Sequence, residues 1–343
     1  MNKNGKLLGQ VWTPKFIVDK MVNLITKQEP NLILETSSGC GNFYYELIKK
    51  YKNVIALEID KNIAHKEAII CSYFDTNYKP DVIIGNPPYI DFKNIKIKPK
   101  SDMLIHKPNL FLFFLEKALS DLKDDGELIW IIPSNVFTNS SSKKLNEMIY
   151  NNFSITHWEI INENVWDNAS ISTAIVKIVK RKNDNDKLNY LLKNGKIIFG
   201  STVKTKLKVV VKVGGASGFN NNLEEGNTEF INSKTERTGA TCFIKYEPKK
   251  WIRPTPKPPI GFTYQIFVNC KTRKNKPFYI LDNLHKGEFI NYDASVLCLY
   301  LFCTKEEQLK FLNILNSYDW EKIGIKKDGR FHFSQSILGA IIE

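Results

Sequence analysis

The tetrapeptide at positions 86–89, Asn-Pro-Pro-Tyr, contains the residue types that point most directly to chemistry in this 343-residue sequence. It follows an apolar run, 82–85, with the composition of a buried strand. Two consecutive prolines fix φ and remove two amide donors, so the chain leaves the strand stiffly with its carbonyls free. The Asn86 side-chain oxygen and the Pro87 carbonyl can then accept hydrogen bonds from a planar NH2 group, while Tyr89 offers a ring on which a base can stack. A proline-rich turn with a packed tyrosine is the structural alternative.

A second candidate site lies upstream, where a glycine-containing turn joins a strand pattern to a helix pattern at 35–43, Glu-Thr-Ser-Ser-Gly-Cys-Gly-Asn-Phe. Glycines at such a turn let a ligand approach the backbone. Glu58 ends the next strand pattern, and an acidic side chain there can accept both hydroxyls of a ribose; an exposed strand-end carboxylate is the alternative. The chain has no phosphate-binding lysine motif, so these residues favour a nucleoside-type cofactor over a nucleoside triphosphate.

Both candidate sites need a parallel sheet to position them. In the first half of the chain, short β-branched runs alternate with helical patterns, as a sheet with crossover helices requires. The sequence predicts helices that include 16–26, 43–50 and 109–122, and strands at 32–35, 54–58, 69–71, 82–85, 128–132, 155–161 and 174–179. We therefore expect an α/β domain with a mostly parallel seven-stranded sheet, whose strand ends carry the site, as is usual in α/β proteins.

Charge is distributed unevenly along the chain. Lys and Arg number 49 and Asp and Glu 36, for a net charge of +13, but residues 1–180 contain 22 basic and 20 acidic side chains, whereas 181–343 contain 27 and 16. A polar, charged stretch at 181–187 suggests a domain boundary, which we place between residues 1–184 and 185–343. The pattern predicts a polyanion-binding module joined to a near-neutral one; a lysine-rich solubility bias is the alternative.

Composition narrows the class of protein. With 43% hydrophobic and 25% charged residues, the chain is typical of globular proteins. No apolar run approaches the roughly 20 residues of a membrane span, and no secretory signal follows the N-terminus, so we expect a cytoplasmic protein without a membrane partner. The six cysteines form no CxxC pair and no Cys/His cluster, and we expect neither disulfides nor a metal site.

Taken together, these motifs resemble those of the DNA methyltransferases that methylate amino groups with S-adenosyl-L-methionine, specifically the gamma-class adenine-N6 enzymes of type II restriction-modification systems. The resemblance extends from Gly9 to about Lys180 and rests on four motifs in order: 9–14 (Gly-Gln-Val-Trp-Thr-Pro), 35–43, Glu58 and 86–89. It implies a Rossmann-like class I methyltransferase domain followed by an α+β target-recognition domain. It also implies that the protein is a monomer that binds double-stranded DNA and flips out the target base. A cognate restriction endonuclease would be encoded separately.

The resemblance also assigns roles to individual residues. Asn86, Pro87 and Tyr89 would act on the target base, and a late aromatic residue, Trp166, would help Tyr89 to clamp it, with an ordinary core tryptophan as the alternative. The family pattern aligns Ser72 where an acidic residue usually holds the cofactor adenine, and we assign that role to Asp75 instead. The residues expected to contact the cofactor are Thr13, Glu35, Ser37, Gly39, Glu58, Ile59, Phe74, Asp75 and Asn86.

Two sets of basic residues are candidates for DNA contact. The polar loop 90–108 is longer than a simple connection requires and bears Lys93 and Lys96, so we expect a mobile loop that orders on DNA, with simple disorder as the alternative. In the second domain the candidate phosphate contacts are Lys249, Lys250, Arg253, Lys271, Arg273, Lys274 and Lys276. The segments 214–219 and 329–335 are further candidates.

Other functions share parts of this pattern. A protein glutamine-N5 methyltransferase acting on release factors can use the same tetrapeptide, but the helical N-terminal domain of such enzymes is not evident here. A non-catalytic DNA-binding specificity subunit would have no use for the tetrapeptide. A fused nuclease is suggested superficially by Asp81 and the run 91–93, Asp-Phe-Lys. Cytosine N4 stays open as the target atom, because cytosine enzymes use a similar site, more often with Ser first.

Overall fold

The computed structural model describes residues 12–161, 165–166, 172–182, 187–200, 202–215, 226, 228–244, 256–323, 325–327 and 329–343. The chain divides into two compact units, Met1–Gly200 and Ser201–Glu343. This division lies beyond the boundary expected after residue 184. The reason is a hairpin of β8 (Tyr190–Lys193) and β9 (Lys196–Phe199), whose apolar side chains join the core of the first unit.

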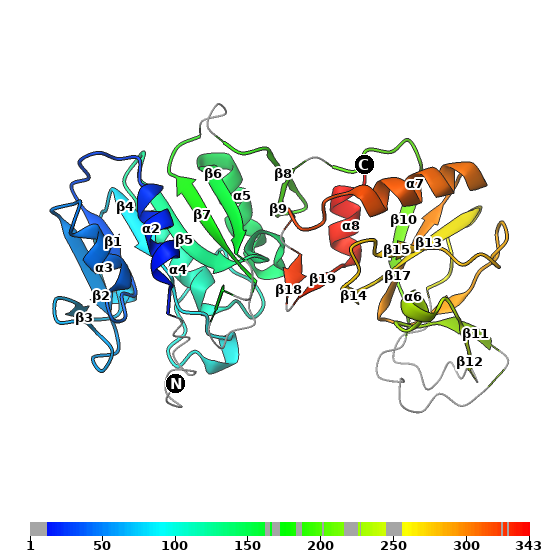
Figure 1. Cartoon of the computed structure of the whole chain (residues 1–343), viewed down its shortest axis with the longest axis horizontal. Helices are drawn as coiled ribbons and strands as arrows, with labels where there is room; N and C mark the ends of the chain where they lie inside the picture. Colours follow the sequence, from blue (N-terminus) through cyan, green and yellow to red (C-terminus); the bar gives the residue numbers. More distant parts are fainter. Residues whose placement is uncertain are drawn as a thin grey trace. The chain divides into compact units, whose positions relative to one another are not determined.

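The first unit is built on one seven-stranded sheet with the strand order β3-β2-β1-β4-β5-β7-β6 (Figure 1). Strands β1 to β5 pair in parallel, and β7 runs antiparallel to both β5 and β6. The strands are β1 (Ile33–Glu35), β2 (Val54–Glu58), β3 (Ile69–Ile70), β4 (Val82–Gly85), β5 (Glu127–Pro133), β6 (Ser154–Ile161) and β7 (Thr173–Val179). All seven predicted strands are present, which confirms the mostly parallel α/β sheet.

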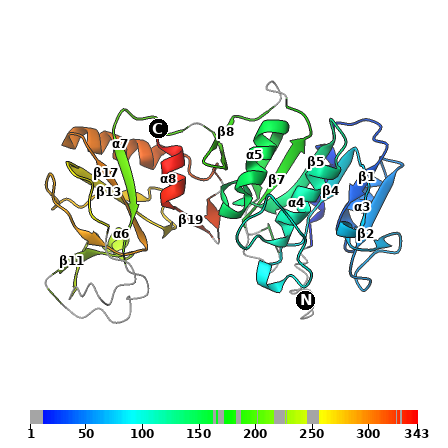
Figure 2. The ribbon, with the colours of Figure 1, turned by 180° about the vertical axis from the view of Figure 1, so that it is seen from behind.

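Helices cover both faces of this sheet, as its continuous apolar strands require. Alternate strand residues enter two separate cores: Ile33 and Ile84 pack with α2 (Lys15–Asn23) and α3 (Asn42–Leu47), whereas Leu34 and Ile83 pack with α4 (Leu110–Asp121) and α5 (Lys143–Asn152). Figures 1 and 2 show α2 on one face and α4 and α5 on the other. The 3-10 turns of this unit are η1 (Tyr73–Asp75), η2 (Phe92–Asn94), η3 (Val136–Thr138) and η4 (Ser140–Ser142).

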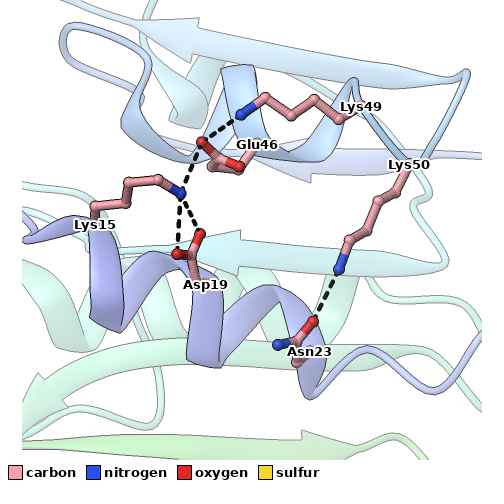
Figure 3. Close-up of polar contacts among 6 residues, drawn as sticks. All are labelled: Lys15, Asp19, Asn23, Glu46, Lys49 and Lys50. Atoms are coloured by element: carbon pink, nitrogen blue, oxygen red, sulfur yellow. Dashed lines mark hydrogen bonds and ion pairs between the residues drawn. The ribbon is translucent and has the colours of Figure 1, made fainter.

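Surface charges and an apolar contact hold α2 beside α3. Figure 3 shows the Lys15 ammonium between two carboxylates, with Nζ 2.8 Å from Asp19 Oδ1 and 3.2 Å from Glu46 Oε1, and Lys49 approaching Glu46 to 2.6 Å. Exposed pairs of this kind contribute little to stability. The packing therefore depends mainly on the buried side chains of the two helices, which are Ile17, Val18, Met21, Val22, Phe43 and Leu47.

The second unit is α+β. Its largest sheet has the antiparallel order β10-β17-β13-β15, and α7 (Lys305–Ser317), which starts with a capping box of Thr304 and Glu307, packs against β13 and β15. Two three-stranded sheets have the orders β12-β11-β16 and β14-β19-β18. The remaining bounds are β10 (Val209–Val213), β11 (Thr228–Ile231), α6 (Thr235–Thr238), β12 (Cys242–Ile244), β13 (Tyr264–Asn269), β14 (Lys271–Thr272), β15 (Phe278–Tyr279), β16 (Asn291–Tyr292), β17 (Val296–Leu301), β18 (Lys326–Lys327), β19 (Arg330–His332) and α8 (Gln335–Ile341).

All six cysteines are free thiols; Cys298 is buried and the other five are half-buried. Within the described part of the chain, no helix has both the length and the apolar composition needed to cross a bilayer.

Candidate active site

The tetrapeptide 86–89 leaves the carboxyl end of β4, between β1 and β5, after Gly85 with a φ of +145° that favours glycine. Asn86 is held at two points: its Nδ2 donates to Thr13 Oγ1 at 3.3 Å, and its backbone carbonyl accepts from Ser37 Oγ at 3.1 Å. Its side-chain Oδ1 is buried and has no hydrogen-bond partner among the described residues. The tetrapeptide therefore presents a fixed, unused acceptor, which is what recognition of an amino group requires.

Tyr89 is fixed by contacts at its hydroxyl and its ring. The hydroxyl donates to the backbone carbonyl of Ile131 in β5 at 2.8 Å, and the ring lies edge-to-face with Phe111 at a centroid distance of 5.8 Å. Burial raises the pKa of the Tyr89 phenol well above its ordinary value, so the group is neutral. A neutral, half-buried ring held in this way is suited to stacking, and the role predicted for Tyr89 stays a prediction.

The glycine turn after β1 is braced by Glu58. The Glu58 carboxylate accepts from the backbone amides of Gly39 at 2.8 Å and Asp60 at 2.9 Å, and it is 7% exposed. Gly39 and Gly41 have φ values of +53° and +89°, and a Cβ on Gly41 would come within 2.9 Å of the His65 side chain. Each carboxylate oxygen keeps a further lone pair, so Glu58 can still accept ribose hydroxyls while it holds the turn.

Glu35, at the end of β1, is a second buried group with an unused acceptor. It is 1% exposed, and its Oε2 has no partner among the residues that the structure describes. Burial raises the pKa of the Glu35 carboxyl well above its ordinary value; the backbone amide of Tyr44 opposes this shift, and the charge of Glu58 adds to it. A buried acceptor beside the glycine turn fits the ammonium group of an amino-acid-like ligand, as in S-adenosylmethionine.

The residues predicted to surround the cofactor adenine lie after β2 and β3. Ile59 follows Glu58 and is 64% exposed, and Phe74 lies edge-to-face with Phe114 at 4.8 Å. The Ser72 hydroxyl caps η1 by accepting from the Phe74 amide at 3.2 Å, whereas Asp75 is exposed. Because Ser72 is already engaged, Asp75 is the freer of the two candidates for an adenine amino group, and its role stays a prediction.

Trp166 lies in the core on the α2 face of the sheet. It is 6% exposed, packs in the cluster that contains Ile17 and Ile175, and donates its indole N–H to Thr173 Oγ1 at 3.0 Å. This is the position of an ordinary core tryptophan, which the sequence left as the alternative. A base can stack on this ring only if these contacts open, so its clamping role stays untested.

The loop 90–108 has contacts of its own. Ile95 is buried, Lys98 Nζ donates to the Ile95 carbonyl at 3.2 Å, and the Ile105 amide donates to the Ser141 carbonyl at 3.2 Å. Lys93 and Lys96 are exposed. The loop thus has local structure of its own. It also presents exposed positive charge just after the tetrapeptide.

The nuclease-like pattern is divided by a strand. Asp81 precedes β4, where it accepts from the Leu32 amide at 2.9 Å and pairs with Lys123 at 3.3 Å, whereas Asp91 follows the tetrapeptide beyond the other end of β4. No group of three His, Cys, Asp or Glu side chains is placed to hold a metal ion in the described ranges. The two acidic residues of the pattern thus lie beyond opposite ends of one strand.

The second unit gathers basic residues that are far apart in the sequence. Lys271, Arg273, Lys274 and Lys276 are exposed on and after β14. Strand β14 pairs with β19, where Lys271 lies opposite His332, and β19 pairs with β18, where Lys326 lies opposite Phe331. The segments 271–276 and 329–335 are joined only by this long-range pairing. The pairing also brings in Lys326, whose Nζ lies 2.7 Å from Glu321 Oε1. Lys249, Lys250 and Arg253, and residues 216–219, lie outside the described residues.

The strand order with an antiparallel β7, the glycine turn after β1, the acidic end of β2 and the tetrapeptide after β4 together define the class I S-adenosylmethionine-dependent methyltransferase fold. More specifically, residues 17–166 match the family described as Eco57I restriction-modification methylase. That segment, which contains the glycine turn, Glu58 and the tetrapeptide, is thus similar to methylases of the restriction-modification type.

Individual relatives agree with this match. The chain is 38% identical over 198 residues to the type II methyltransferases M.HincII of Haemophilus influenzae and M.HindII of Haemophilus influenzae strain Rd, covering 53% of this chain and 39% and 38% of theirs. It thus spans about two-fifths of their length. The structure of the type IIL restriction-modification enzyme MmeI in complex with DNA shares its fold, with a TM-score of 0.53 at 10% identity over 99% of this chain and 64% of that one.

Proposed function

We propose that this protein is a site-specific DNA methyltransferase that transfers a methyl group from S-adenosylmethionine to N6 of adenine in double-stranded DNA, as the modification enzyme of a type II restriction-modification system. The observation that carries the proposal is the buried Oδ1 of Asn86, which has no hydrogen-bond partner among the described residues. It lies in the tetrapeptide that follows the carboxyl end of β4, where ligands of this fold class bind. The match of residues 17–166 to a methylase family supports it.

The two acceptors address the main chemical difficulty of the reaction. The lone pair of adenine N6 is delocalised into the ring, which makes the nitrogen a poor nucleophile. Hydrogen bonds from its NH2 group to Asn86 Oδ1 and the Pro87 carbonyl draw the nitrogen toward tetrahedral geometry and stabilise the positive charge that develops on it. Bound S-adenosylmethionine would supply an electrophilic methyl group. As the N–C bond forms and the S–C bond breaks, N6 gains positive charge, and its proton can leave to water without a dedicated base.

The cofactor site is assigned to the turn after β1 and its neighbours. Glu35 Oε2 would accept from the cofactor ammonium, Glu58 from the ribose hydroxyls, and Asp75 from the adenine amino group. Ile59 and Phe74 would line the adenine, and Gly39 permits close approach of the ligand to the backbone. Thr13 and Ser37, which the sequence also assigned to the cofactor, already bond to Asn86.

DNA must be bound and opened for this chemistry. Adenine N6 lies inside the duplex, so the base has to be flipped out at a cost of a few kcal/mol, which stacking on Tyr89 and base-edge contacts would offset. Lys93 and Lys96 of the loop 90–108 and the basic residues of β14 and β19 in the second unit are the proposed phosphate contacts. The proposal includes a monomer in the cytoplasm and a separately encoded restriction endonuclease that recognises the same site.

The decisive test is direct. The full chain is incubated with duplex DNA and S-adenosylmethionine that carries a deuterated methyl group, and the digested nucleosides are identified by mass spectrometry. We expect labelled N6-methyladenine. Labelled 4-methylcytosine alone would move the target to cytosine, and the absence of any labelled base would overturn the proposal. As a control, Asn86→Ala should abolish transfer while calorimetry shows unchanged binding of S-adenosylmethionine.

A further inference from the structure

Asn86 has a side chain with two chemically opposite ends, and only one of them suits the proposed reaction. The target NH2 group is a donor, so it can be recognised by the carboxamide oxygen but not by the carboxamide nitrogen. The two ends exchange when χ2 turns by half a rotation, and χ2 of asparagine is a soft, roughly two-fold torsion. Something in the site must therefore select one orientation.

We propose that Thr13 is a positioning residue that orients the Asn86 carboxamide so that its oxygen faces the target amino group; this inference rests on the proposed function. Thr13 Oγ1 accepts from Asn86 Nδ2 at 3.3 Å. The opposite end, Oδ1, is the buried atom without a partner among the described residues. Thr13 thereby engages the donor end and leaves the acceptor end for the substrate.

Thr13 is itself held in place. Thr13 is 5% exposed. Its backbone carbonyl accepts a hydrogen bond from Nδ2 of Asn42 at 3.0 Å, and Asn42 is the first residue of α3. The carbonyl of the next residue, Pro14, accepts from the amides of Ile17 and Val18 and so begins α2. The hydroxyl that meets Asn86 is thus fixed between the start of α2 and the end of the glycine turn.

The main chain of Asn86 is secured independently. Its carbonyl accepts from Ser37 Oγ at 3.1 Å, so loss of the Thr13 hydroxyl would leave the backbone of the tetrapeptide and the Pro87 carbonyl in place. The effect of removing that hydroxyl should therefore fall on the orientation of one side chain. This differs from the cofactor contact that the sequence assigned to Thr13, and the two roles make different predictions.

The test compares Thr13→Val, which keeps the shape but removes the hydroxyl, with Thr13→Ser, which keeps the hydroxyl. Single-turnover methyl transfer is measured at saturating S-adenosylmethionine and DNA, and cofactor affinity is measured separately by calorimetry. We expect Thr13→Val to lower the transfer rate about 10-fold, the equivalent of one hydrogen bond, with cofactor affinity unchanged within about twofold. Thr13→Ser should restore most of the rate. Thr138→Val, which removes a hydroxyl bond to the Asn135 carbonyl in η3, is the matched control and should keep the wild-type rate.

Each contrary outcome is distinct. An unchanged transfer rate in Thr13→Val with weakened cofactor binding would assign Thr13 to the cofactor and overturn the inference. An equal loss in Thr13→Ser and Thr13→Val would show that the methyl group matters rather than the hydroxyl, and would overturn it as well. If the wild-type chain transfers no methyl group to adenine, the proposed function itself fails, whereas a normal rate in Thr13→Val beside an active wild type defeats only the inference.

Discussion

Glu35 and Asn86 are alike at the residue scale: each places a buried oxygen with no described partner at the carboxyl edge of the sheet. A buried acceptor without a donor costs free energy, on the order of 1–3 kcal/mol. Such groups persist where a ligand completes them. The two residues belong to the ends of β1 and β4, which are neighbours in the sheet, and this adjacency is what allows one site to hold both cofactor and base.

Glu35→Gln should stabilise the protein above the ordinary carboxyl pKa of 4.5. Because the pKa of Glu35 is raised in the folded state, the unfolded chain releases this proton first as the pH rises. The free energy of unfolding of the wild type therefore falls by up to about 1.4 kcal/mol per pH unit until the folded-state pKa is reached. Gln stays neutral and avoids that loss. Urea unfolding of both proteins at pH 5, 6, 7 and 8 should show a growing advantage for the variant, while its affinity for S-adenosylmethionine falls.

The matched control is Glu46→Gln, at a half-buried surface carboxylate whose pKa is lowered by hydrogen bonds from Lys49 and Lys15 (Figure 3). The Glu46 carboxylate stabilises the fold at neutral pH, and this contribution is lost on acidification. Glu46→Gln should therefore lower the free energy of unfolding slightly, by an amount that shrinks as the pH falls. A stability difference between Glu35→Gln and wild type that does not change with pH would contradict the raised pKa of Glu35.

Two substitutions of Tyr89 separate the contribution of the ring from that of the hydroxyl. Tyr89→Phe keeps the ring but removes the bond to the Ile131 carbonyl, and we expect its methyl-transfer rate to fall by less than 10-fold, in line with about 1 kcal/mol for one hydrogen bond. Tyr89→Ala also removes stacking worth about 1–3 kcal/mol and should be the slower enzyme. Single-turnover rates check this, with 2-aminopurine fluorescence reporting the flipped base. Equal rates for the two variants would mean that the ring does not stack on the base.

At the element scale, a buried polar cluster ties the C-terminal end of α2 to the sheet. Lys177 Nζ on β7 lies 3.2 Å from Glu127 Oε1 on β5 and donates to the Leu24 carbonyl at 2.8 Å, while Glu127 accepts from the Thr26 amide at 3.1 Å. Burial lowers the pKa of Lys177, and Glu127 opposes that shift. Since α2 is the helix that follows Thr13, its anchorage also supports the active site.

Glu127→Gln should therefore be strongly destabilising, because it leaves the Lys177 ammonium buried without a counter-ion. We expect a loss of about 3–5 kcal/mol in the free energy of unfolding, measured by urea titration of the full chain. Glu127→Leu combined with Lys177→Met should recover most of this loss, since it removes both charges together. Glu306→Gln, which breaks an exposed pair with Lys310 on α7, is the control and should have little effect. Similar losses for Glu127→Gln and Glu306→Gln would mean that the buried cluster is not a structural anchor.

At the scale of the whole molecule, charge and chemistry are divided between two parts of the chain. Residues 1–180, with 22 basic and 20 acidic side chains, contain the tetrapeptide and the glycine turn, whereas residues 181–343, with 27 and 16, contain the basic strands β14, β18 and β19. A near-neutral unit that carries the candidate active site and a basic unit are what the proposed DNA methyltransferase would need, because phosphate contacts supply most of the non-specific affinity for DNA.

Removing basic residues from β14 and the turn after it should therefore weaken the salt dependence of DNA binding. The triple variant Lys271→Gln, Arg273→Gln, Lys274→Gln should reduce the slope of log affinity against log salt by roughly 0.9 for each phosphate that is no longer neutralised. Fluorescence anisotropy with a duplex between 50 and 300 mM salt, roughly the range in which such phosphate binding is resolved, measures this. Lys310→Gln, which removes one positive charge from α7, is the control for the loss of a single charge outside the proposed contacts. An unchanged slope in the triple variant would exclude these residues as phosphate ligands.

Local sequence was sufficient for the seven strands of the sheet that carries the candidate site. The strands at 54–58 and 82–85 were predicted with the bounds that the structure has, because parallel strands buried on both faces are short apolar runs that Gly, Pro and Asp delimit. The tetrapeptide and the glycine turn were recognisable for a related reason, since their conformations demand particular residues.

Tertiary structure decided what depends on contacts between distant residues. Thr13 meets Asn86, and Lys271 meets His332, only because folding closes long loops, and no local pattern encodes such pairings. Trp166 could be read as a clamp or as core, and its burial followed from its place in the core cluster that includes residues of α2 and β7. Short-range sterics and hydrophobic periodicity thus determine which elements form, whereas the partner of each polar side chain is set by the packing of the complete sheet.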